Sequence, residues 1–447
     1  MGRIRGVHAP HMKNTAGRAP EPLPVPSEVR IPTSMHSGAP AKPVVRAGDE
    51  VRIGQIIADA DGFVSSPVHS SVSGKVKEIT GYDDLTGRSD VSIVIETDGL
   101  QTLLEGLAPP VVTNLREFLG AVRDSGAVGL GGAGYPTAPK LRFKETDKLD
   151  YILINGAECE PYVTSDTHTM TEDAEFVHEG VAALRRYLDP GKIIICVEKN
   201  KPEAIAKMKA AFAGEEGVEI RILPSAYPQG ERKVLVYNVT GRIVPEGGRL
   251  INVGCTVLNC TTVSVFGRYL KQGMPLTQRV VTVDGPAVKS PKNVIAPIGT
   301  PIRELFEFCG GFTGGEPRKI LAGGPMMGVA VPNLDVPVVK TTNSILAFAG
   351  KQAAAPKETA CVRCGRCVRV CPMKLSPLNI ETAFSLNKRE ALQSYKVGMC
   401  IECGSCAYSC PAKRPLVQVM QLSKALVKEY AADQKSRAAE GGQKEAK

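Results

Sequence analysis

The stretch CVRCGRCVRVCP at residues 361–372 returns, with the same cysteine spacing, as CIECGSCAYSCP at residues 400–411. Each copy reads Cys-x2-Cys-x2-Cys-x3-Cys-Pro, so three thiolates lie in one short loop and a fourth follows just beyond it. Pro372 and Pro411 lack an N–H group and stop the chain from continuing as a helix. The repeat therefore predicts two adjacent metal-binding loops near the C-terminus.

This spacing predicts two [4Fe–4S] clusters with crossed ligands, because the fourth cysteine of such a run ligates the other cluster in two-cluster proteins. The expected ligand sets are Cys361, Cys364, Cys367 and Cys410 for cluster 1, and Cys400, Cys403, Cys406 and Cys371 for cluster 2. Structural zinc and disulfides are the alternatives, but eight cysteines without an interleaved histidine fit the cluster spacing better. Two adjacent clusters carry single electrons, so the rest of the chain must indicate the donor and the acceptor.

The composition excludes several classes of protein. The 447 residues predict about three or four domains, at roughly 100–200 residues each. A net charge of +9, with no Trp and only 5% aromatic residues, does not indicate nucleic-acid binding. The mild positive net charge fits a protein that lies against an acidic partner or a membrane surface, although basic side chains that merely face solvent are the commoner explanation.

The remaining cysteines and the ends of the chain predict a cytoplasmic protein. Five scattered cysteines lie outside the two runs, which is typical of reduced thiols: Cys159, Cys196, Cys255, Cys260 and Cys309. The N-terminus has no apolar signal region. No stretch approaches the roughly 18 uninterrupted apolar residues of a membrane helix, so membrane association is expected only through partners.

Local patterns divide the chain into segments. Residues 1–112 combine a proline-rich extended arm with short alternating strands, which resemble the barrel-sandwich motif of biotinyl and lipoyl domains but lack a carrier lysine. Residues 113–275 alternate helices and strands, which predicts a parallel α/β sheet with its site at the strand carboxyl ends. Short strands and one helix over 276–350 predict a β-grasp domain. Residues 351–432 hold the clusters between helices, and residues 433–447 are expected to form a disordered tail.

A glycine-rich loop follows the first helix of the α/β segment and matches G-x-G-x-x-G at Gly129, Gly131 and Gly134. An ordinary dinucleotide-binding loop should follow a strand and open a helix, whereas here a helix precedes the loop and Pro136 follows it. The glycine-rich loop has two interpretations. Its backbone could closely approach a flat or phosphorylated ligand, or it could be merely a flexible loop.

Acidic and polar residues accompany this loop. Asn155, Glu158 and Glu160 end a buried strand, and glycine-containing turns follow at 227–233 and 251–254. Buried carboxylates are costly unless they form hydrogen bonds. Together these segments favour a ligand site, although each could be a capped turn.

Four of these motifs resemble the flavin and NADH loops of the flavoprotein subunit of respiratory complex I. They are Gly-Gly-Ala-Gly-Tyr-Pro-Thr (131–137), Asn-Gly-Ala-Glu-Cys-Glu-Pro (155–161), Tyr-Pro-Gln-Gly-Glu (227–231) and Asn-Val-Gly (252–254). With the barrel-sandwich pattern, the SLBB-like β-grasp pattern and the tandem cysteine runs, nearly the whole chain resembles the C-subunit family of the Rnf complex. That complex is an ion-translocating ferredoxin:NAD oxidoreductase.

The resemblance implies a multidomain α/β protein that binds FMN and NAD(H). The implied FMN contacts are Gly131, Gly132, Gly134, Lys140, Asn155, Glu158, Tyr227, Gly230, Glu231 and Asn252. The implied NADH contacts are Tyr135 and Phe143 at the flavin and Glu160 at the sugar. Ala157 and Arg232 replace acidic residues of the complex I pattern, which leaves the nicotinamide contacts less defined, and Arg232 and Lys233 could instead face a diphosphate.

A flavin exchanges electrons in pairs with a nicotinamide and singly with an iron–sulfur cluster, which explains why both cofactors belong to one chain. The resemblance implies a peripheral subunit on the cytoplasmic face of the membrane, partnered by integral-membrane and iron–sulfur subunits and linked indirectly to ferredoxin. The alternatives are a non-catalytic relay and docking subunit without flavin, and a soluble NADH dehydrogenase or hydrogenase diaphorase subunit.

Overall fold

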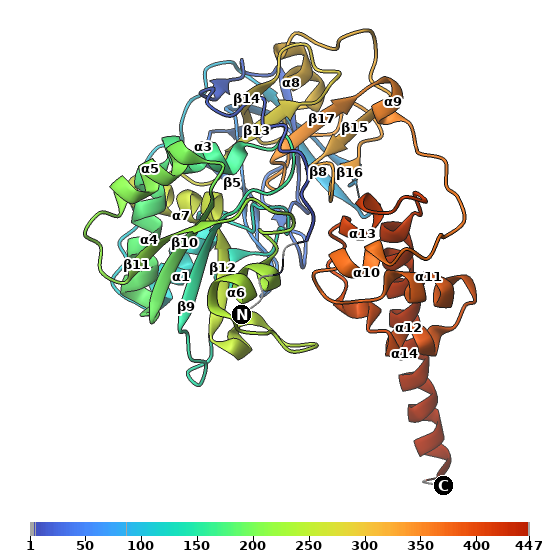
Figure 1. Ribbon diagram of the computed structural model, residues 1–447. Coiled ribbons are helices and arrows are strands. Elements are labelled where there is room, and N and C mark those ends of the chain that lie inside the picture. The colour runs from blue at the N-terminus through green and yellow to red at the C-terminus, as the bar shows by residue number, and fades with distance from the viewer. Residues whose placement is uncertain (1–3, 5, 86, 446–447) are drawn as a thin grey trace. The chain divides into compact units, whose positions relative to one another are not determined.

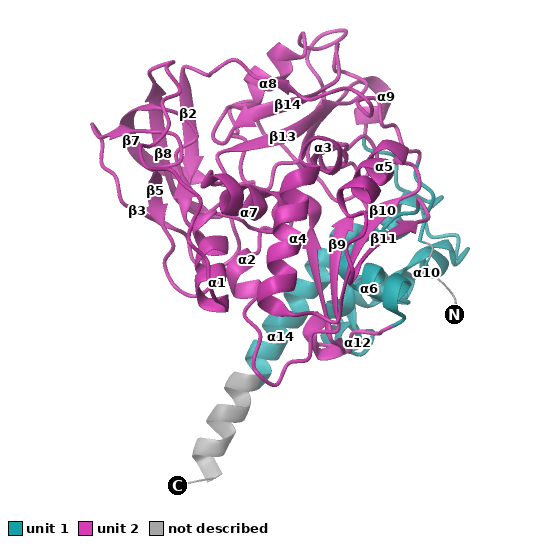
Figure 2. Ribbon diagram, turned by 90° about the vertical axis from the view of Figure 1, so that its left-hand side faces the viewer, with its two compact units in different colours: residues 1–9, 226–241, 355–447 teal, residues 10–225, 242–354 magenta. Residues whose placement is uncertain are grey.

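The computed structural model describes residues 4, 6–85 and 87–445, and the chain forms two compact units (Figures 1 and 2). Unit 1 contains residues 1–9, 226–241 and 355–447, and unit 2 contains residues 10–225 and 242–354. Among the described residues, no helix is long and apolar enough to cross a membrane. Unit 1 therefore joins the two cysteine runs to a short segment from the middle of the chain.

The N-terminal part of unit 2 is a pair of small sheets, with strand orders β2-β8-β7-β4 and β3-β5-β6. The strands are β2 (Glu28–Pro32), β3 (Lys42–Pro43), β4 (Glu50–Val51), β5 (Ile56–Asp59), β6 (Val68–His69), β7 (Gly74–Asp83) and β8 (Ser89–Thr97). Alternate residues point to one face of a strand, so Val29 and Ile31 of β2 are both buried, and they join Ile93 and Ile95 in one core. This arrangement is the predicted barrel-sandwich domain.

A four-stranded parallel sheet with the order β11-β10-β9-β12 forms the second part of unit 2 (Figure 1). Its elements are α1 (Leu115–Asp124), α2 (Thr137–Lys140), β9 (Tyr151–Gly156), α3 (Ser165–Glu172), α4 (Ala174–Leu188), β10 (Lys192–Glu198), α5 (Pro202–Ala211), β11 (Val218–Leu223), η1 (Leu250–Val253), β12 (Cys255–Asn259) and α7 (Cys260–Gln272). The chain runs outward from β9 to β11 and returns on the other side of β9 with β12. In such sheets ligands bind where the strand order reverses, here at the carboxyl ends of β9 and β12.

The third part of unit 2 is a mixed sheet with the order β1-β14-β13-β17-β15-β16. Its elements are β1 (Glu21–Pro22), β13 (Gln278–Asp284), β14 (Lys292–Pro297), α8 (Ile302–Phe308), β15 (Lys319–Ala322), β16 (Val329–Ala330), β17 (Ser344–Phe348) and α9 (Gly350–Ala353). Strand β1 comes from the N-terminal arm and pairs in parallel with β14. The arm is therefore extended, as predicted, but is built into the β-grasp sheet.

Unit 1 is helical, and Figure 2 colours α6 together with α10, α12 and α14. Its elements are α6 (Arg232–Thr240), α10 (Arg366–Val370), α11 (Pro377–Ser385), α12 (Arg389–Ser394), η2 (Val397–Met399), α13 (Ser405–Tyr408) and α14 (Leu416–Glu445). Ile380, Leu392, Val397 and Met420 form its buried core. Helix α14 continues through 433–445, where the sequence predicts disorder, because Ala, Glu, Lys and Gln are strong helix formers. Residues 446–447 of that expected tail lie outside the described residues.

Candidate flavin and iron–sulfur sites

The glycine-rich loop of unit 2 lies beside the carboxyl end of β12. Its ends are tied together by hydrogen bonds from Gly129 N to Tyr135 O and from Gly134 N to Gly129 O, both 2.9 Å long. Gly132 and Gly134 have φ values of +110° and +62°, which favour glycine. A Cβ atom on Gly131 would lie 3.2 Å from Asn259 Nδ2 at the start of α7. The loop is therefore a shaped backbone element placed at the reversal point of the sheet.

The end of β9 and the loop that follows it carry two of the predicted flavin residues, Asn155 and Glu158. Asn155 Oδ1 accepts a 3.0 Å hydrogen bond from Ala157 N. The Glu158 carboxylate is buried and accepts hydrogen bonds from Asp166 N and Thr167 Oγ1, both at 2.7 Å. Glu158 thus holds the first turn of α3 against the end of β9. Asn155 and Glu158 therefore both lie at the predicted edge of the sheet.

Two lysines that sequence analysis missed hold the same loop from behind. Lys13 Nζ, in the N-terminal arm, donates to the carbonyls of Glu158 at 3.0 Å, of Glu160 at 2.8 Å, and of Val163. Lys201 Nζ donates to the Glu158 carbonyl and to Glu198 Oε2, both at 3.1 Å. Burial lowers the pKa of Lys13. No local signal marks Lys13, whereas Lys201 could have been found because it follows β10 at the same edge.

A buried polar network connects α3 to α7 beneath the glycine loop. Asn259 Nδ2 and Thr261 Oγ1 each donate to the Asp166 carboxylate at 2.7 Å. Burial raises the pKa of Asp166 to about 6, and the charge of Glu158 adds to the shift. Arg279 Nη2 donates to the Leu130 carbonyl of the glycine loop at 3.4 Å, and burial lowers the pKa of Arg279 to about 10. This network fixes the position of the loop relative to the end of β12.

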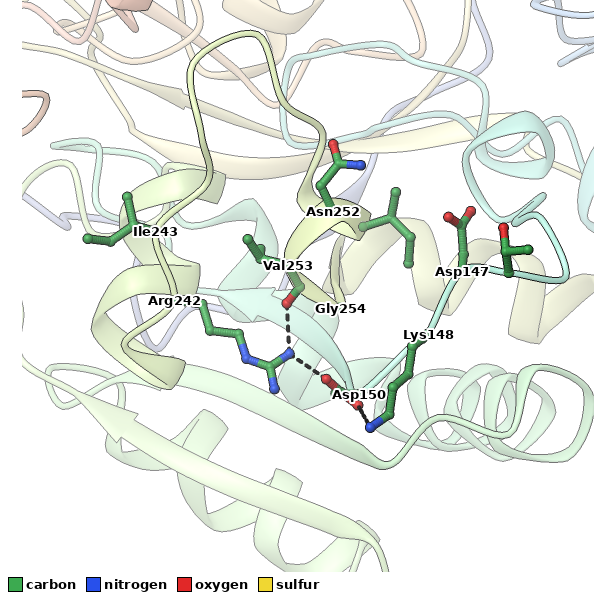
Figure 3. A pocket seen from close by; sticks show the side chains of 10 residues that line it. Asp147, Lys148, Asp150, Arg242, Ile243, Asn252, Val253 and Gly254 are labelled. Atoms are coloured by element: carbon green, nitrogen blue, oxygen red, sulfur yellow. Dashed lines mark hydrogen bonds and ion pairs between the residues drawn. The ribbon is translucent and has the colours of Figure 1, made fainter.

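Asn252, a predicted FMN contact, lies at the opposite end of the sheet (Figure 3). It is in η1, before β12 begins, and its Oδ1 accepts a 2.7 Å hydrogen bond from Arg249 N. It lines an open pocket with Arg242 and Asp150, which are joined by a 2.6 Å ion pair. Since β12 pairs in parallel with β9, the five-residue strand separates Asn252 from the carboxyl edge by about 16 Å.

The structure therefore does not bring Asn252 together with Asn155 and the glycine loop. Asn259 takes that position, because it is the last residue of β12 and pairs with Asn155, one residue before the end of β9. The signal that could have identified Asn259 is the one that marks Asn155: an asparagine that directly follows a run of apolar residues.

The predicted NADH contacts have different surroundings. Tyr135, on the glycine loop, is 39% exposed. Phe143 is half-buried and packs against the hydrophobic core of the α/β sheet, three residues after Lys140 at the end of α2. Glu160 Oε2 accepts a 3.0 Å hydrogen bond from Met326 N, in the loop between β15 and β16. A Cβ on Gly324 would lie 2.3 Å from the same carboxylate oxygen, so the β-grasp loop approaches Glu160 closely.

The predicted flavin residues Tyr227, Gly230 and Glu231 belong to unit 1. Tyr227 is buried and pairs with Val7 through two backbone hydrogen bonds of 2.8 and 3.0 Å. Glu231 Oε2 accepts hydrogen bonds from Lys233 N at 2.8 Å and Val234 N at 3.0 Å, which caps α6. Burial raises the pKa of Glu231, and the backbone hydrogen bonds oppose that shift.

Four cysteines of unit 1 line one pocket whose apolar wall includes Leu375, Val417 and Met420. These cysteines are Cys371, Cys400, Cys403 and Cys406, the set expected for cluster 2. The other run places Cys367 near Cys410 and Cys361: burial raises the pKa of Cys367, and the charges of those two cysteines add to the shift. Each pairing crosses from one run to the other.

Backbone amides point at the cysteine sulfurs. Arg363 N, Leu375 N and Glu402 N donate to Cys361 Sγ, Cys371 Sγ and Cys400 Sγ, each at 3.4 Å. Such N–H···S contacts accompany thiolate ligands and set cluster potentials. Within the described part of the chain, no group of three or more His, Cys, Asp or Glu side chains is placed to hold a single metal ion. The all-thiol donor sets and the amide contacts fit iron–sulfur clusters.

Family models match the chain in four successive stretches. They are the RnfC barrel sandwich hybrid domain over 3–100, the Nuo51 FMN-binding domain over 122–266, the SLBB domain over 280–330 and the 4Fe-4S dicluster domain over 356–411. The predicted fold class is confirmed, since all four predicted domain types are present in the predicted order. Fold and sites together define an electron-transfer protein built for a flavin and two [4Fe–4S] clusters.

Relatives of known name match nearly the whole chain. It is 43% identical over 427 residues to the C subunit of the proton-translocating ferredoxin:NAD(+) oxidoreductase complex of Clostridium ljungdahlii, covering 94% of this chain and 93% of the relative. It is 40% identical over 426 residues to the C subunit of the Na(+)-translocating complex of Acetobacterium woodii, covering 94% and 95%. The chain belongs to the C-subunit family of the ion-translocating Rnf oxidoreductase complexes.

Another relative is longer, and the match to solved structures is weaker. The C subunit of the ion-translocating oxidoreductase complex of Cronobacter sakazakii is 38% identical, and the match covers 97% of this chain but 56% of that protein. A crystal structure of an NAD+-reducing [NiFe]-hydrogenase in the H2-reduced state matches with a TM-score of 0.47 at 18% identity, covering 69% of this chain and 62% of the hydrogenase chain.

Proposed function

We propose that this chain is the NAD(H)-reacting peripheral subunit of a membrane-bound, ion-translocating ferredoxin:NAD+ oxidoreductase. In this proposal electrons pass between NAD(H), FMN and two [4Fe–4S] clusters, and then to integral-membrane and iron–sulfur subunits on the cytoplasmic face of the membrane. The observation that carries it is the presence of an FMN-binding and a dicluster domain in one chain that matches two named C subunits over at least 93% of their length. Their names differ in the translocated ion, so the proposal assigns no ion to this chain.

FMN, when bound, supplies the exchange between paired and single electrons. In unit 2 we assign FMN binding to the glycine loop, Asn155, Glu158 and Asn259. The loop's glycines permit close backbone approach to a flat ligand, and its hydrogen bonds fix that surface in advance. The buried carboxylate of Glu158 and the lysines Lys13 and Lys201 hold the loop after β9. Lys140 is a further proposed FMN contact in unit 2. Tyr227, Gly230 and Glu231, in unit 1, stay predictions of the family resemblance.

Tyr135 and Phe143 are proposed to contact the nicotinamide, and Glu160 its sugar. The exposure of Tyr135 supports its assignment, because an exposed aromatic ring on the glycine loop is open to a planar ligand. The engagement of Glu160 with Met326 N supports a role in which the β-grasp loop orients that carboxylate.

An anaerobic NADH titration tests the proposal. Purified protein is extracted with acid to release flavin, and intact protein is titrated with NADH while flavin and cluster absorbance are followed. The expected result is about one FMN for each chain and reduction of both cofactors by NADH. If no FMN is released and NADH reduces nothing, the chain is a non-catalytic relay subunit. Recovery from the cytosol alone, with none in washed membranes, would instead favour a soluble diaphorase subunit.

A further inference from the structure

The two cysteine loops of unit 1 share one backbone shape but differ in exposure. Arg363 and Glu402 occupy equivalent positions with φ values of +54° and +56°, and Gly365 and Gly404 follow with +70° and +75°. In the first loop Cys361 and Cys364 are exposed, whereas in the second Cys400 is half-buried and Cys403 is buried. The loop over 361–364 therefore faces solvent, while its repeat over 400–403 faces protein.

The two loops also differ in charge at equivalent positions. The first carries Arg363, Arg366 and Arg369, all exposed, where the second carries Glu402, Ser405 and Tyr408. The sequence contains no Asp or Glu from 359 through 380, so no neighbouring acid along the chain offsets these arginines. The nearby Arg414, by contrast, forms ion pairs with Glu358 and Glu381. The basic surface, defined here as Arg363, Arg366 and Arg369, surrounds only the exposed cysteines.

The buried cysteine loop lies close to a segment assigned to flavin binding. The carboxylate of Glu231, in the same unit, is close enough to Cys403 for the two groups to interact electrostatically. Glu231 belongs to the 227–231 turn, for which the family resemblance implies FMN contacts. Within unit 1, the pocket of Cys371, Cys400, Cys403 and Cys406 therefore lies near the 227–231 turn.

We propose that the basic surface around Cys361 and Cys364 is the docking site for an acidic redox protein, with which cluster 1 exchanges electrons. One electron leaves reduced cluster 1 as one oxidised centre of the partner is reduced, and no bond is made or broken. This inference rests on the proposed function and adds to it the cluster that faces the partner, which is cluster 1. An anionic lipid surface would also attract arginines, but it accepts no electron, and the arginines alternate with the cluster ligands themselves.

Two small electron acceptors of opposite charge test the surface in the full-length holoprotein. NADH-dependent reduction of ferricyanide, a trianion, and of hexaammineruthenium(III), a trication, is measured at low and high salt. The test variant is Arg363→Glu/Arg366→Glu, which leaves the hydrogen bond from Arg369 Nη1 to Cys364 O in place. Arg363→Lys/Arg366→Lys keeps the charge, and Lys388→Glu/Lys428→Glu makes the same charge change at exposed positions outside both cysteine runs.

For the wild type and both controls we expect ferricyanide reduction to fall with salt. Charge reversal should lower the rate of ferricyanide reduction about tenfold at low salt and raise the rate of hexaammineruthenium reduction. At high salt the rates of the variant and the wild type should converge for each acceptor, because salt screens the charges. Iron content, flavin content and the NADH-reduced cluster spectrum should stay unchanged, which separates a surface effect from cluster loss.

Equal salt dependence in the wild type and the charge-reversal variant would overturn the proposal. A second measurement examines binding to phosphatidylglycerol vesicles. If the variant loses vesicle binding while its acceptor rates keep the wild-type salt dependence, the surface is a lipid contact and the proposal is wrong. Failure of the wild type to release FMN or to oxidise NADH would instead contradict the proposed function, so the two failures are distinguishable.

Discussion

At the scale of single residues, buried lysines join segments of unit 2 that are far apart in the sequence. Lys340 Nζ donates to Pro67 O at 2.6 Å, to Gly126 O at 2.9 Å and to Ser66 Oγ at 3.2 Å. These acceptors come from the barrel-sandwich domain and from the turn after α1. Burial lowers the pKa of Lys340 to about 7. One side chain thus satisfies buried carbonyls of two domains.

Replacing Lys340 by Met should destabilise unit 2 by about 3 kcal/mol, because three buried acceptors lose their donor. The folded-state pKa is about 7 and the unfolded value is near 10.4, so the unfolded chain binds more protons between these pH values. The contribution of Lys340 to stability therefore rises from pH 7 to about pH 10, and this rise should be absent in the variant.

Urea unfolding at pH 7 and pH 9 measures both effects. Lys289→Met, at an exposed position, is the matched control and should change little. An unchanged pH slope in Lys340→Met would contradict the assigned burial effect.

Asn259 and Asn252 give a second test at the residue scale, because they lie at opposite ends of β12. Asn259→Ser keeps an N-cap for α7 but loses the amide that donates to Asp166. We expect it to weaken FMN binding about tenfold, equivalent to about 1.4 kcal/mol, while Asn252→Ser leaves binding unchanged. Fluorescence titration of flavin-free protein with FMN measures both, and equal losses would show that the assignment to Asn259 is incorrect.

At the scale of elements, α4 and α7 cross through two glycines. A Cβ on Gly180 would lie 2.5 Å from Val263 O, and one on Gly267 would lie 2.0 Å from Phe176 O. No larger residue fits either position at this helix separation. Because Asn259 caps α7, the close crossing also sets where the cap meets the glycine loop.

Gly267→Ala should therefore force the two helices apart and cost about 1–3 kcal/mol. Gly120→Ala in α1 is the control, because a Cβ there meets nothing within 4 Å and should stabilise the helix by up to about 1 kcal/mol. Thermal unfolding of the two variants decides the point: equal midpoints would mean that the crossing tolerates a methyl group.

At the scale of the whole molecule, each predicted cluster joins the two cysteine runs across the 28 residues between Cys371 and Cys400, numbered 372–399. Cys410→Ser should remove cluster 1 selectively, and Cys371→Ser should remove cluster 2, because each supplies the crossed ligand. Iron content should fall to about half in each variant, and EPR spectra of the reduced proteins should show different surviving signals.

Cys309→Ser changes a buried thiol outside the runs and should keep the full iron content. Loss of the Cys400-led signal in Cys410→Ser, with the Cys361-led signal intact, would indicate that each run closes on itself.

Much of the candidate site could be predicted from local sequence. The glycine loop and the loop after β9 each carry their information within a few residues, since glycine spacing and a polar residue after an apolar strand act over short distances. The family resemblance implies Asn252, but only the strand register shows that Asn259 is the asparagine at the carboxyl edge. Lys13 could not be predicted, because nothing near it in the sequence indicates three carbonyls about 145 residues away.

The sequence by itself determined the cysteine ligand types, their spacing, the domain order and the glycine loop, because these depend on covalent spacing and local backbone preference. Only the tertiary structure decided which residues meet: Lys13 with the loop after β9, Asn259 with the glycine loop, and Glu231 with the buried cysteines. It also decided that one cysteine loop is exposed and basic while its repeat is buried. The physical reason is that burial and long-range contacts arise from packing of distant segments, which no short stretch of sequence specifies alone.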